Sequence, residues 1–250
     1  MSEIMQRPFP VRFETTGPPD TLEVSVVFQT PADQTAKDGL QEVLTTFTKL
    51  GEVGGLAGEK LAPGQSGMTL NSSRVTSQET HWGFQNVKID PRSIFILLNM
   101  IHYIHLENVP LKDVRIAWPA LKQLKDPMAI EFPEQWPQLS FALDIGEMLD
   151  DIDVVIDLEQ PQEDSTIEKI IETMSVWLLA THRGAYADDS FDPSKSAVFL
   201  GPDVMELSPA RIVWFIEIMR CSENALDGFF NVLEWVHQNI ARIKSVELGP

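Results

Sequence analysis

Apolar and polar residues alternate most clearly in two seven-residue segments, 22–28 and 152–158. In both segments every even-numbered residue is apolar, whereas Glu23, Asp153 and Asp157 stand among the odd-numbered ones. A period of two is typical of a β-strand that buries one face and exposes the other. The pattern therefore predicts two strands of one design, 130 positions apart in the chain.

The segment after each strand has the spacing of a helix. Apolar residues recur at three- and four-residue intervals over residues 40–47 and again over residues 170–177. Such spacing indicates an amphipathic helix with one apolar side. Each helix runs toward a glycine, Gly54 in one case and Gly184 in the other, and glycine commonly follows the last turn of a helix.

A second helix is expected in each half of the chain. An Asp-Pro pair at residues 90–91 and a Ser-Pro pair at residues 208–209 resemble helix starts, in which proline follows a capping side chain. Strongly apolar stretches follow these pairs, over residues 94–101 and 212–219. Taking the two stretches as equivalent helices leaves the amphipathic segment 225–238 as a helix that only the second half has.

The remaining strands complete the same order of elements in both halves. They are predicted at residues 10–15, 55–61, 81–89 and 114–118, and at residues 139–145, 185–191, 197–207 and 242–248. A leading strand followed by β-α-β-β-α-β is the order of a ferredoxin-like domain, in which both helices cover one face of an antiparallel sheet. We expect the leading strand to form a hairpin with the strand that follows it.

The repeated order predicts an α+β protein made by tandem duplication of a ferredoxin-like (β)βαββαβ domain, with the two copies related by a pseudo-two-fold axis. The first repeat would span residues 9–119, and the second residues 139–250 with an extra helix near 225–238. Three prolines mark residues 120–138, between the repeats, as a Pro-rich linker.

Acidic residues are concentrated in the second half. The net charge is −18, and a nucleic-acid-binding surface needs clustered Lys and Arg, so nucleic acid is not expected as a partner. Residues 1–125 hold 12 Lys and Arg against 13 Asp and Glu, whereas residues 126–250 hold 7 against 24. The two copies therefore differ far more in charge than in apolar pattern, which indicates either that they have different roles or that the second copy carries a solubilising surface.

The sharpest charge feature is a run of acidic residues on and around the strand 152–158. Asp151, Asp153, Asp157 and Glu159 should project from one face of this strand. Three interpretations are open: a docking site for a basic protein partner, a site for a hard cation such as Ca²⁺, or a solvated surface that prevents unwanted association. The ligand spacing and glycine of an EF-hand are absent from the sequence, so no metal site is predicted.

Histidines are the other candidate polar groups. His102 and His105 stand three positions apart on an expected helix, a spacing that can place two imidazoles on one metal ion. Only two of the usual three or four ligands are visible, so the sequence predicts neither a metal site nor a cofactor. A groove between the repeats is the default pocket, with His81, His102 and His105 as its candidate polar groups. No catalytic residue is assigned.

Cysteine content and hydropathy limit the kinds of site and the cellular location expected for the protein. The single cysteine, Cys221, excludes an intramolecular disulfide and a cysteine-based metal cluster. No apolar run approaches the ~20 residues of a membrane span, and residues 1–10 carry no signal core, so we expect a cytoplasmic protein without a membrane partner. The internal pairing of repeats predicts a monomer or a weak dimer. Trp118 and Trp136, which flank the linker, are expected to hold the repeats together.

Together the patterns favour a non-catalytic binding or adaptor protein whose acidic second repeat engages a basic protein partner. The alternative is an enzyme or a small-ligand-binding protein that uses the groove between the two repeats.

Overall fold

The computed structural model describes residues 6–107, 109–136, 138–147, 152–187, 200–217 and 224–249, so Asp151 and Cys221 lie outside the described residues. The first half contains β1 (Val11–Glu14), β2 (Leu22–Phe28), α1 (Gln34–Glu52), β3 (Thr69–Val75), β4 (Glu79–Gln85), α2 (Ser93–Leu106) and β5 (Leu111–Ala117). The second half contains β6 (Ala142–Ile145), β7 (Ile152–Leu158), α3 (Asp164–His182), β8 (Leu200–Ser208), β9 (Arg211–Glu217), α4 (Asn224–Asn239) and β10 (Ile243–Gly249). A short 3₁₀ helix, η1 (Pro119–Gln123), lies between the halves.

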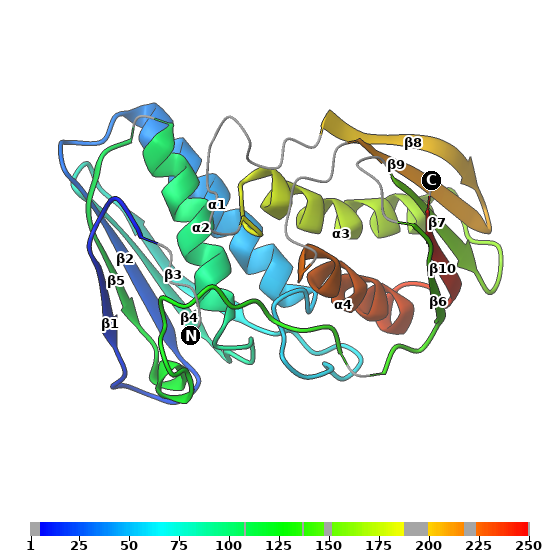
Figure 1. The fold of residues 1–250 in the computed structure, drawn as a ribbon, viewed down its shortest axis with the longest axis horizontal. Coiled ribbons are helices and arrows are strands. Elements are labelled where there is room, and N and C mark those ends of the chain that lie inside the picture. The colour runs from blue at the N-terminus through cyan, green and yellow to red at the C-terminus, as the bar shows by residue number, and fades with distance from the viewer. Residues whose placement is uncertain are drawn as a thin grey trace.

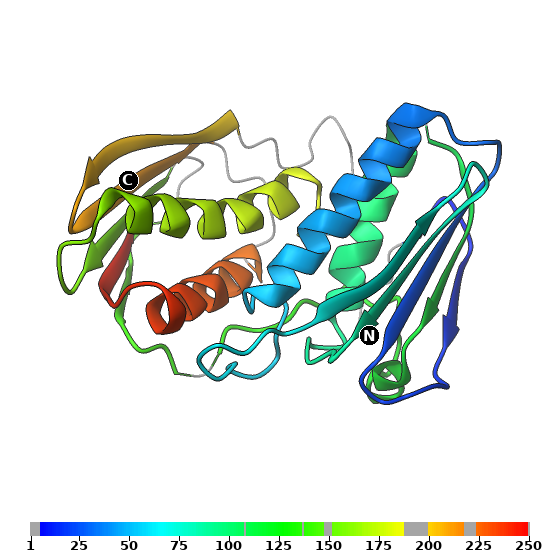
Figure 2. The same ribbon diagram turned by 180° about the vertical axis from the view of Figure 1, so that it is seen from behind.

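The two sheets stand at opposite ends of the molecule, and the helices lie between them (Figure 1). Helix α1 packs against α2 of its own half and against α3 of the other half, while α3 also packs against α4. The reverse view shows the same layers, with the outer face of each sheet turned away from the helices (Figure 2). The structure is therefore a mixed α+β arrangement of two five-stranded sheets that enclose four helices, within the part of the chain described.

Both sheets have the same strand order, β1-β5-β2-β4-β3 and β6-β10-β7-β9-β8. The hairpin expected between the first two strands was wrong, because β5 lies between β1 and β2 and pairs with β1 in parallel. The second sheet repeats this with β6 parallel to β10, so neither sheet is purely antiparallel. The connection from β1 to β2 only has to cross two strand spacings, roughly 10 Å, which a short loop spans easily.

The assignment of the second helix in the second half was also wrong. Residues Arg211–Glu217 form strand β9, and the Pro209-Ala210 pair is the turn of the β8–β9 hairpin, where the sequence suggested a helix start. Helix α4 then occupies the same place in the order of elements as α2, so the helix predicted near 225–238 is not an additional one. The uniform apolar run of β9 misled the prediction, because such a run suits a buried strand as well as a helix.

The strand expected at residues 55–61 was wrong too. This stretch forms turns with one isolated bridge, from Ala57 to Ile89, and the third strand of the first sheet is instead β3. Strand β3 lies at the edge of its sheet and is exposed at almost every position, so it has no alternation of apolar and polar residues that a prediction could detect. Among the described residues, no helix is long and apolar enough to cross a bilayer.

Individual interactions recur in the two halves, with a spacing of 130 positions for residues of β2 and β7 and of 132 positions for the tryptophans and histidines described next. Trp82 and Trp214 are both fully buried, and they pair across their sheets with Val24 and Val154 respectively. At the C-terminal ends of α2 and α4, Nδ1 of His105 and of His237 each lies 3.1 Å from the amide nitrogen that opens the next strand, Leu111 in one half and Ile243 in the other. A buried tryptophan and a contact between a histidine and a backbone amide thus recur at matching places in both halves.

Both imidazoles have a pKa shifted toward the neutral form. Burial lowers the pKa of His105 and of His237 below the ordinary value of 6.5, because a charged ring loses its hydration. Nδ1 of His237 also lies 3.1 Å from the carbonyl oxygen of Ile243. Nδ1 of His237 accepts the Ile243 amide, as Nδ1 of His105 accepts the Leu111 amide. A neutral ring has the free lone pair that this hydrogen bond needs.

This arrangement predicts how stability depends on pH. Since the folded pKa values lie below 6.5, the unfolded chain binds protons that the folded chain does not, and the histidines' contribution is present above pH 6.5 and is lost as the pH falls below it. At pH 8 a His105→Ala, His237→Ala variant should unfold in urea with a free energy about 1–3 kcal/mol below that of the wild type. The gap should narrow toward pH 5. A gap that does not change with pH contradicts the assignment of the two neutral acceptors.

Candidate functional site

The candidate site is the outer face of the second sheet. Strand β7 alternates between the two faces, and its core-facing residues, Ile152, Val154, Ile156 and Leu158, are buried against the helices. Its other residues, Asp153, Val155 and Asp157, point to the outer face, where they are half-buried. No helix covers that face in either view (Figure 1, Figure 2).

Neighbouring strands extend the negative charge across this face. Glu247 of β10 pairs with Val155 on one side and with Asp144 of β6 on the other, and both carboxylates are exposed. Glu159 follows the end of β7 and is exposed as well. We call these carboxylates the acidic face; its members are Asp144, Asp153, Asp157, Glu159 and Glu247.

An apolar strip runs through the middle of the acidic face. Val155 is paired with Val213 of β9, which is only 9% exposed, and Asp153 is paired with the half-buried Phe215. Val155 and Phe215 are half-buried and present apolar surface on the face, whereas Val213 beside them is largely covered by its neighbours. The outer face therefore combines an apolar centre with carboxylates around it.

One cation balances part of this charge. Arg211 of β9 stands opposite Asp157 and its Nη1 lies 3.2 Å from the Asp157 carboxylate, with both side chains more than a third exposed. An ion pair so open to water contributes about 0–1 kcal/mol. Among the described residues, no cation lies within ion-pair distance of Asp144, Asp153 or Glu247.

The structure places some of the acidic residues of this face where the sequence predicted them, and the prediction missed others. Asp153 and Asp157 lie on one face of β7 as the alternation predicted, and Glu159 is exposed just beyond the strand. Asp144 and Glu247 were missed as members of the same face, because β6 and β10 are joined to it only by strand pairing. The sequence held one signal that could have placed Glu247 on this face. Glu247 lies 132 positions after Arg115 of the first sheet, and the same spacing relates Trp82 to Trp214.

The three candidate histidines do not converge. His81 lies on the outer face of the first sheet, with Nδ1 3.0 Å from the Ser25 hydroxyl. His102 lies on the opposite, helix side, where it is buried and its Nδ1 is 3.2 Å from Nη1 of Arg7. Burial, followed by the positive charge of Arg7, lowers the pKa of His102 to about 4. His105 is occupied by its bond to the Leu111 amide.

Metal ligation finds no support in these positions. The described residues contain no cluster of three or more His, Cys, Asp or Glu side chains that could hold a metal ion. Nδ1 of His105 accepts a backbone amide, and His102 is turned toward Arg7, so the pair does not present two free nitrogens at Nδ1.

The space between the two sheets is filled by helices and by the segment that joins the halves. Phe132 of this segment lies between Phe95 of α2 and Tyr186, with ring centroids 5.2 and 6.0 Å apart. Buried Asn99 of α2 donates from Nδ2 to the carbonyl of Ala185 in the other half, 3.0 Å away. Three cavities, of about 250, 470 and 490 Å³, are each lined by residues of the first half or of η1.

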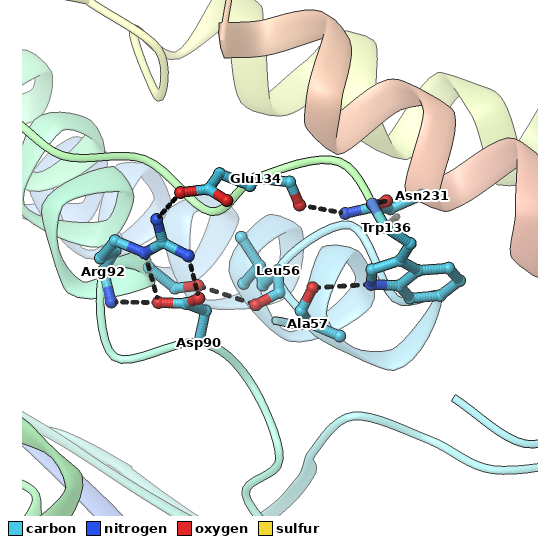
Figure 3. A network of polar contacts seen from close by, with 8 residues as sticks. Leu56, Ala57, Asp90, Arg92, Glu134, Trp136 and Asn231 are labelled. Carbon is cyan, nitrogen blue, oxygen red and sulfur yellow. Dashed lines mark hydrogen bonds and ion pairs between the residues drawn. The ribbon is translucent and has the colours of Figure 1, made fainter. Parts of the chain in front are cut away.

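A polar network fixes the connecting segment across the junction (Figure 3). Trp136 is buried, and its indole nitrogen donates to the carbonyl of Ala57, 2.8 Å away in the first half. Its backbone amide donates to Oδ1 of Asn231 on α4, also at 2.8 Å. Asn231 in turn donates to the carbonyl of Glu134 at 3.1 Å. Trp136 therefore contacts both halves, as predicted for a tryptophan at the end of the linker.

Arg92 completes the network. Its guanidinium binds Asp90 at 2.7 Å and Glu134 at 2.6 Å (Figure 3), and the Asp90 hydrogen bond is the main reason that its pKa is raised. The Asp90 amide donates to the Leu56 carbonyl at 2.8 Å. The polar groups that join the halves form hydrogen bonds and ion pairs with one another, so this junction has a structural role.

Comparisons with known proteins give no family for the chain. No family model matches it, and no curated protein matches it. Among solved structures, the ligand-free regulatory subunit of aspartate kinase from Thermus thermophilus is 10% identical over 88% of this chain and 97% of its own, with a TM-score of 0.24. Complex III2 from Candida albicans with Inz-5 bound is 10% identical over 95% and 76%, at 0.24. A protease from Helicobacter pylori is 11% identical over 93% and 78%, at 0.21. Scores this low say nothing about activity.

The Trp136 indole bond predicts a measurable loss of stability. In a Trp136→Phe variant the buried Ala57 carbonyl loses its donor, which should lower the free energy of unfolding by about 1–3 kcal/mol in urea. Trp82→Phe is the matched control, because the buried Trp82 indole nitrogen has no hydrogen-bond partner among the described residues. Equal losses in the two variants contradict a role for the indole bond at the junction.

Proposed function

We propose that the protein is a non-catalytic binding protein that docks a basic protein partner on the acidic face. The observation that carries the proposal is the union, on one uncovered sheet face, of an apolar strip with carboxylates from β6, β7 and β10. Protein interfaces commonly place apolar side chains at the centre and polar ones around them. A partner with Lys and Arg around an apolar patch would complement this face.

The charge pattern favours docking over the two other interpretations. A surface that only prevents association has no need of Val155, Val213 and Phe215 at its centre. A Ca²⁺ ion takes six to eight oxygen ligands, whereas the described residues contain no group of three or more Asp, Glu, His or Cys side chains that could hold a metal ion. Asp157 is already engaged by Arg211. The alternative of an enzyme or ligand-binding protein stays a prediction, and none of the three cavities described above is lined by both halves.

We also infer that the two halves arose by tandem duplication of a ferredoxin-like domain. The first copy would be residues 9–119 and the second residues 139–250, joined by residues 120–138. The identical strand orders and the interactions repeated 132 positions apart, such as those of His105 and His237, support this origin. The helix-to-helix pairing of the copies would then correspond to a dimer interface retained within one chain.

The docking proposal predicts that binding of a cationic probe depends on this face. Reversing two of its charges, with Asp153→Lys and Asp157→Lys, should lower the salt concentration that elutes the protein from immobilised poly-lysine, because face-specific attraction is lost. The control is Glu168→Lys with Glu172→Lys, on the exposed side of α3, which changes the net charge equally.

The face variant should elute at clearly lower salt than the control variant. Elution of both at the same salt would mean that net charge alone governs retention, and the proposal would fail. Far-UV circular dichroism of both variants checks that each remains folded.

A further inference from the structure

The outer face of the first sheet carries a row of basic residues that crosses all five strands. Arg12 of β1 is paired with Arg115 of β5, and Arg115 is paired with Ser25 of β2. Ser25 is paired with His81 of β4, and His81 with Arg74 of β3. Directly paired residues point to the same face of a sheet. The arginines are exposed, so three guanidinium groups and an imidazole form a continuous row, which we call the basic row.

Equivalent positions in the second sheet have the opposite charge. The strand pairing there places Asp144 beside Glu247, Glu247 beside Val155, and Val155 beside Val213. Arg12 corresponds to Asp144 and Arg115 to Glu247, each 132 positions apart. The polar centre of the basic row, Ser25 and His81, corresponds to the apolar centre of the acidic face. One row of the sheet is thus basic at one end of the molecule and acidic at the other.

The arginines of the basic row are only partly engaged in ion pairs within their own sheet. The Asp113 carboxylate, 3% exposed, lies 3.2 Å from Nε of Arg12 and 2.8 Å from Nε of Arg115. The side chains of Arg12 and Arg115 nevertheless remain 65% and 50% exposed. Arg74 has no ion-pair partner among the described residues. The carboxylates of Glu14, Glu23 and Glu79 flank the row on the same face, so the positive charge is confined to the row itself.

We propose that the basic partner of the acidic face is the basic row of a second copy of this chain. The inference rests on the proposed function, and it names the partner for that face. Because the two surfaces lie at opposite ends of one molecule (Figure 1), docking is head-to-tail. The copy at each end of an assembly then keeps one free face. The contact therefore builds open chains of copies, not a closed dimer.

The size of the sheet faces sets the strength of this contact. Five strands at about 4.8 Å spacing and seven residues at about 3.3 Å give roughly 550 Å² on each copy. A total near about 1,100 Å² is typical of weak and transient contacts. The net charge of −18 on every copy opposes association further at low salt. Self-association should therefore be seen at concentrations of several hundred micromolar.

Sedimentation equilibrium of the full chain and of two charge-reversed variants tests the proposal. Variant one is Arg12→Glu with Arg74→Glu, which keeps Arg115 on Asp113, and variant two is Asp144→Lys with Glu247→Lys. The wild type should rise above its monomer mass of 28.1 kDa with concentration, and each variant alone should stay at that mass. An equimolar mixture of the two should associate again, because each acidic surface then meets a basic one.

A control variant, Lys49→Glu with Lys169→Glu on α1 and α3, changes charge as much as variant one and should associate like the wild type. If Arg12→Glu weakens the strand beside Asp113, Arg12→Gln with Arg74→Gln should still lower the association constant at least tenfold. A wild type that stays at 28.1 kDa at every concentration, or a mixture of folded variants that stays monomeric, overturns the inference. Retention on poly-lysine that depends on the acidic face would in that case leave the proposed function standing.

Discussion

Helix α2 is apolar on every side, and the layered arrangement of the molecule depends on covering all of it. Each residue from Ser93 to His102 is buried, including those that point away from the first sheet. A helix that is apolar all round is stable only when it is enclosed. Phe132 and Tyr186 cover the far side of α2, and Asn99 there finds its acceptors in the other half. The second half is therefore part of the core of the first.

The enclosed helices decide which surfaces are free. Each sheet uses its inner face to cover its own pair of helices, and the helices cover one another, so the outer faces turn to solvent. Polar residues can vary on these faces without disturbing the core. The carboxylates of the acidic face and the arginines of the basic row occupy equivalent positions, which is where two halves with a common scaffold are free to differ. The lopsided charge of the sequence thereby becomes a difference between the two ends of the molecule.

Local patterns predicted the strands and helices whose two sides differ. Alternation in residues 22–28 and 152–158 matches β2 and β7 at both ends, and the 3–4 spacing lies within α1 and α3. The apolar run of β9 has no such contrast, since Val213 is nearly as buried as its core-facing neighbours, and it was assigned to a helix. The constant spacing from Trp82 to Trp214 would have corrected this assignment.

Local sequence patterns could not predict which strands pair when they are far apart in the chain. Nothing near β1 indicates that β5, a hundred residues later, takes the place beside it, so the parallel pair was missed. The acidic face was half predicted for the same reason: Asp153 and Asp157 share a strand, while Glu247 reaches the face only through the pairing of β10 with β7. The halves pair through their helices, and none of the three cavities described above lies between the two sheets, where the groove was expected.

The distance between the two outer faces tests this arrangement most directly. Nitroxide labels at Ser25→Cys and Val155→Cys, in a Cys221→Ser background, would report it by pulsed dipolar spectroscopy, with unlabelled protein added to suppress distances between copies. Sheet, two helix layers and sheet, stacked at roughly 10 Å each, place the labelled backbones about 30 Å apart, and labels pointing outward lengthen this. A distance clearly below about 30 Å, as for two sheets packed face to face at about 10 Å with the same outward labels, would contradict the enclosed helix layer and the two free faces.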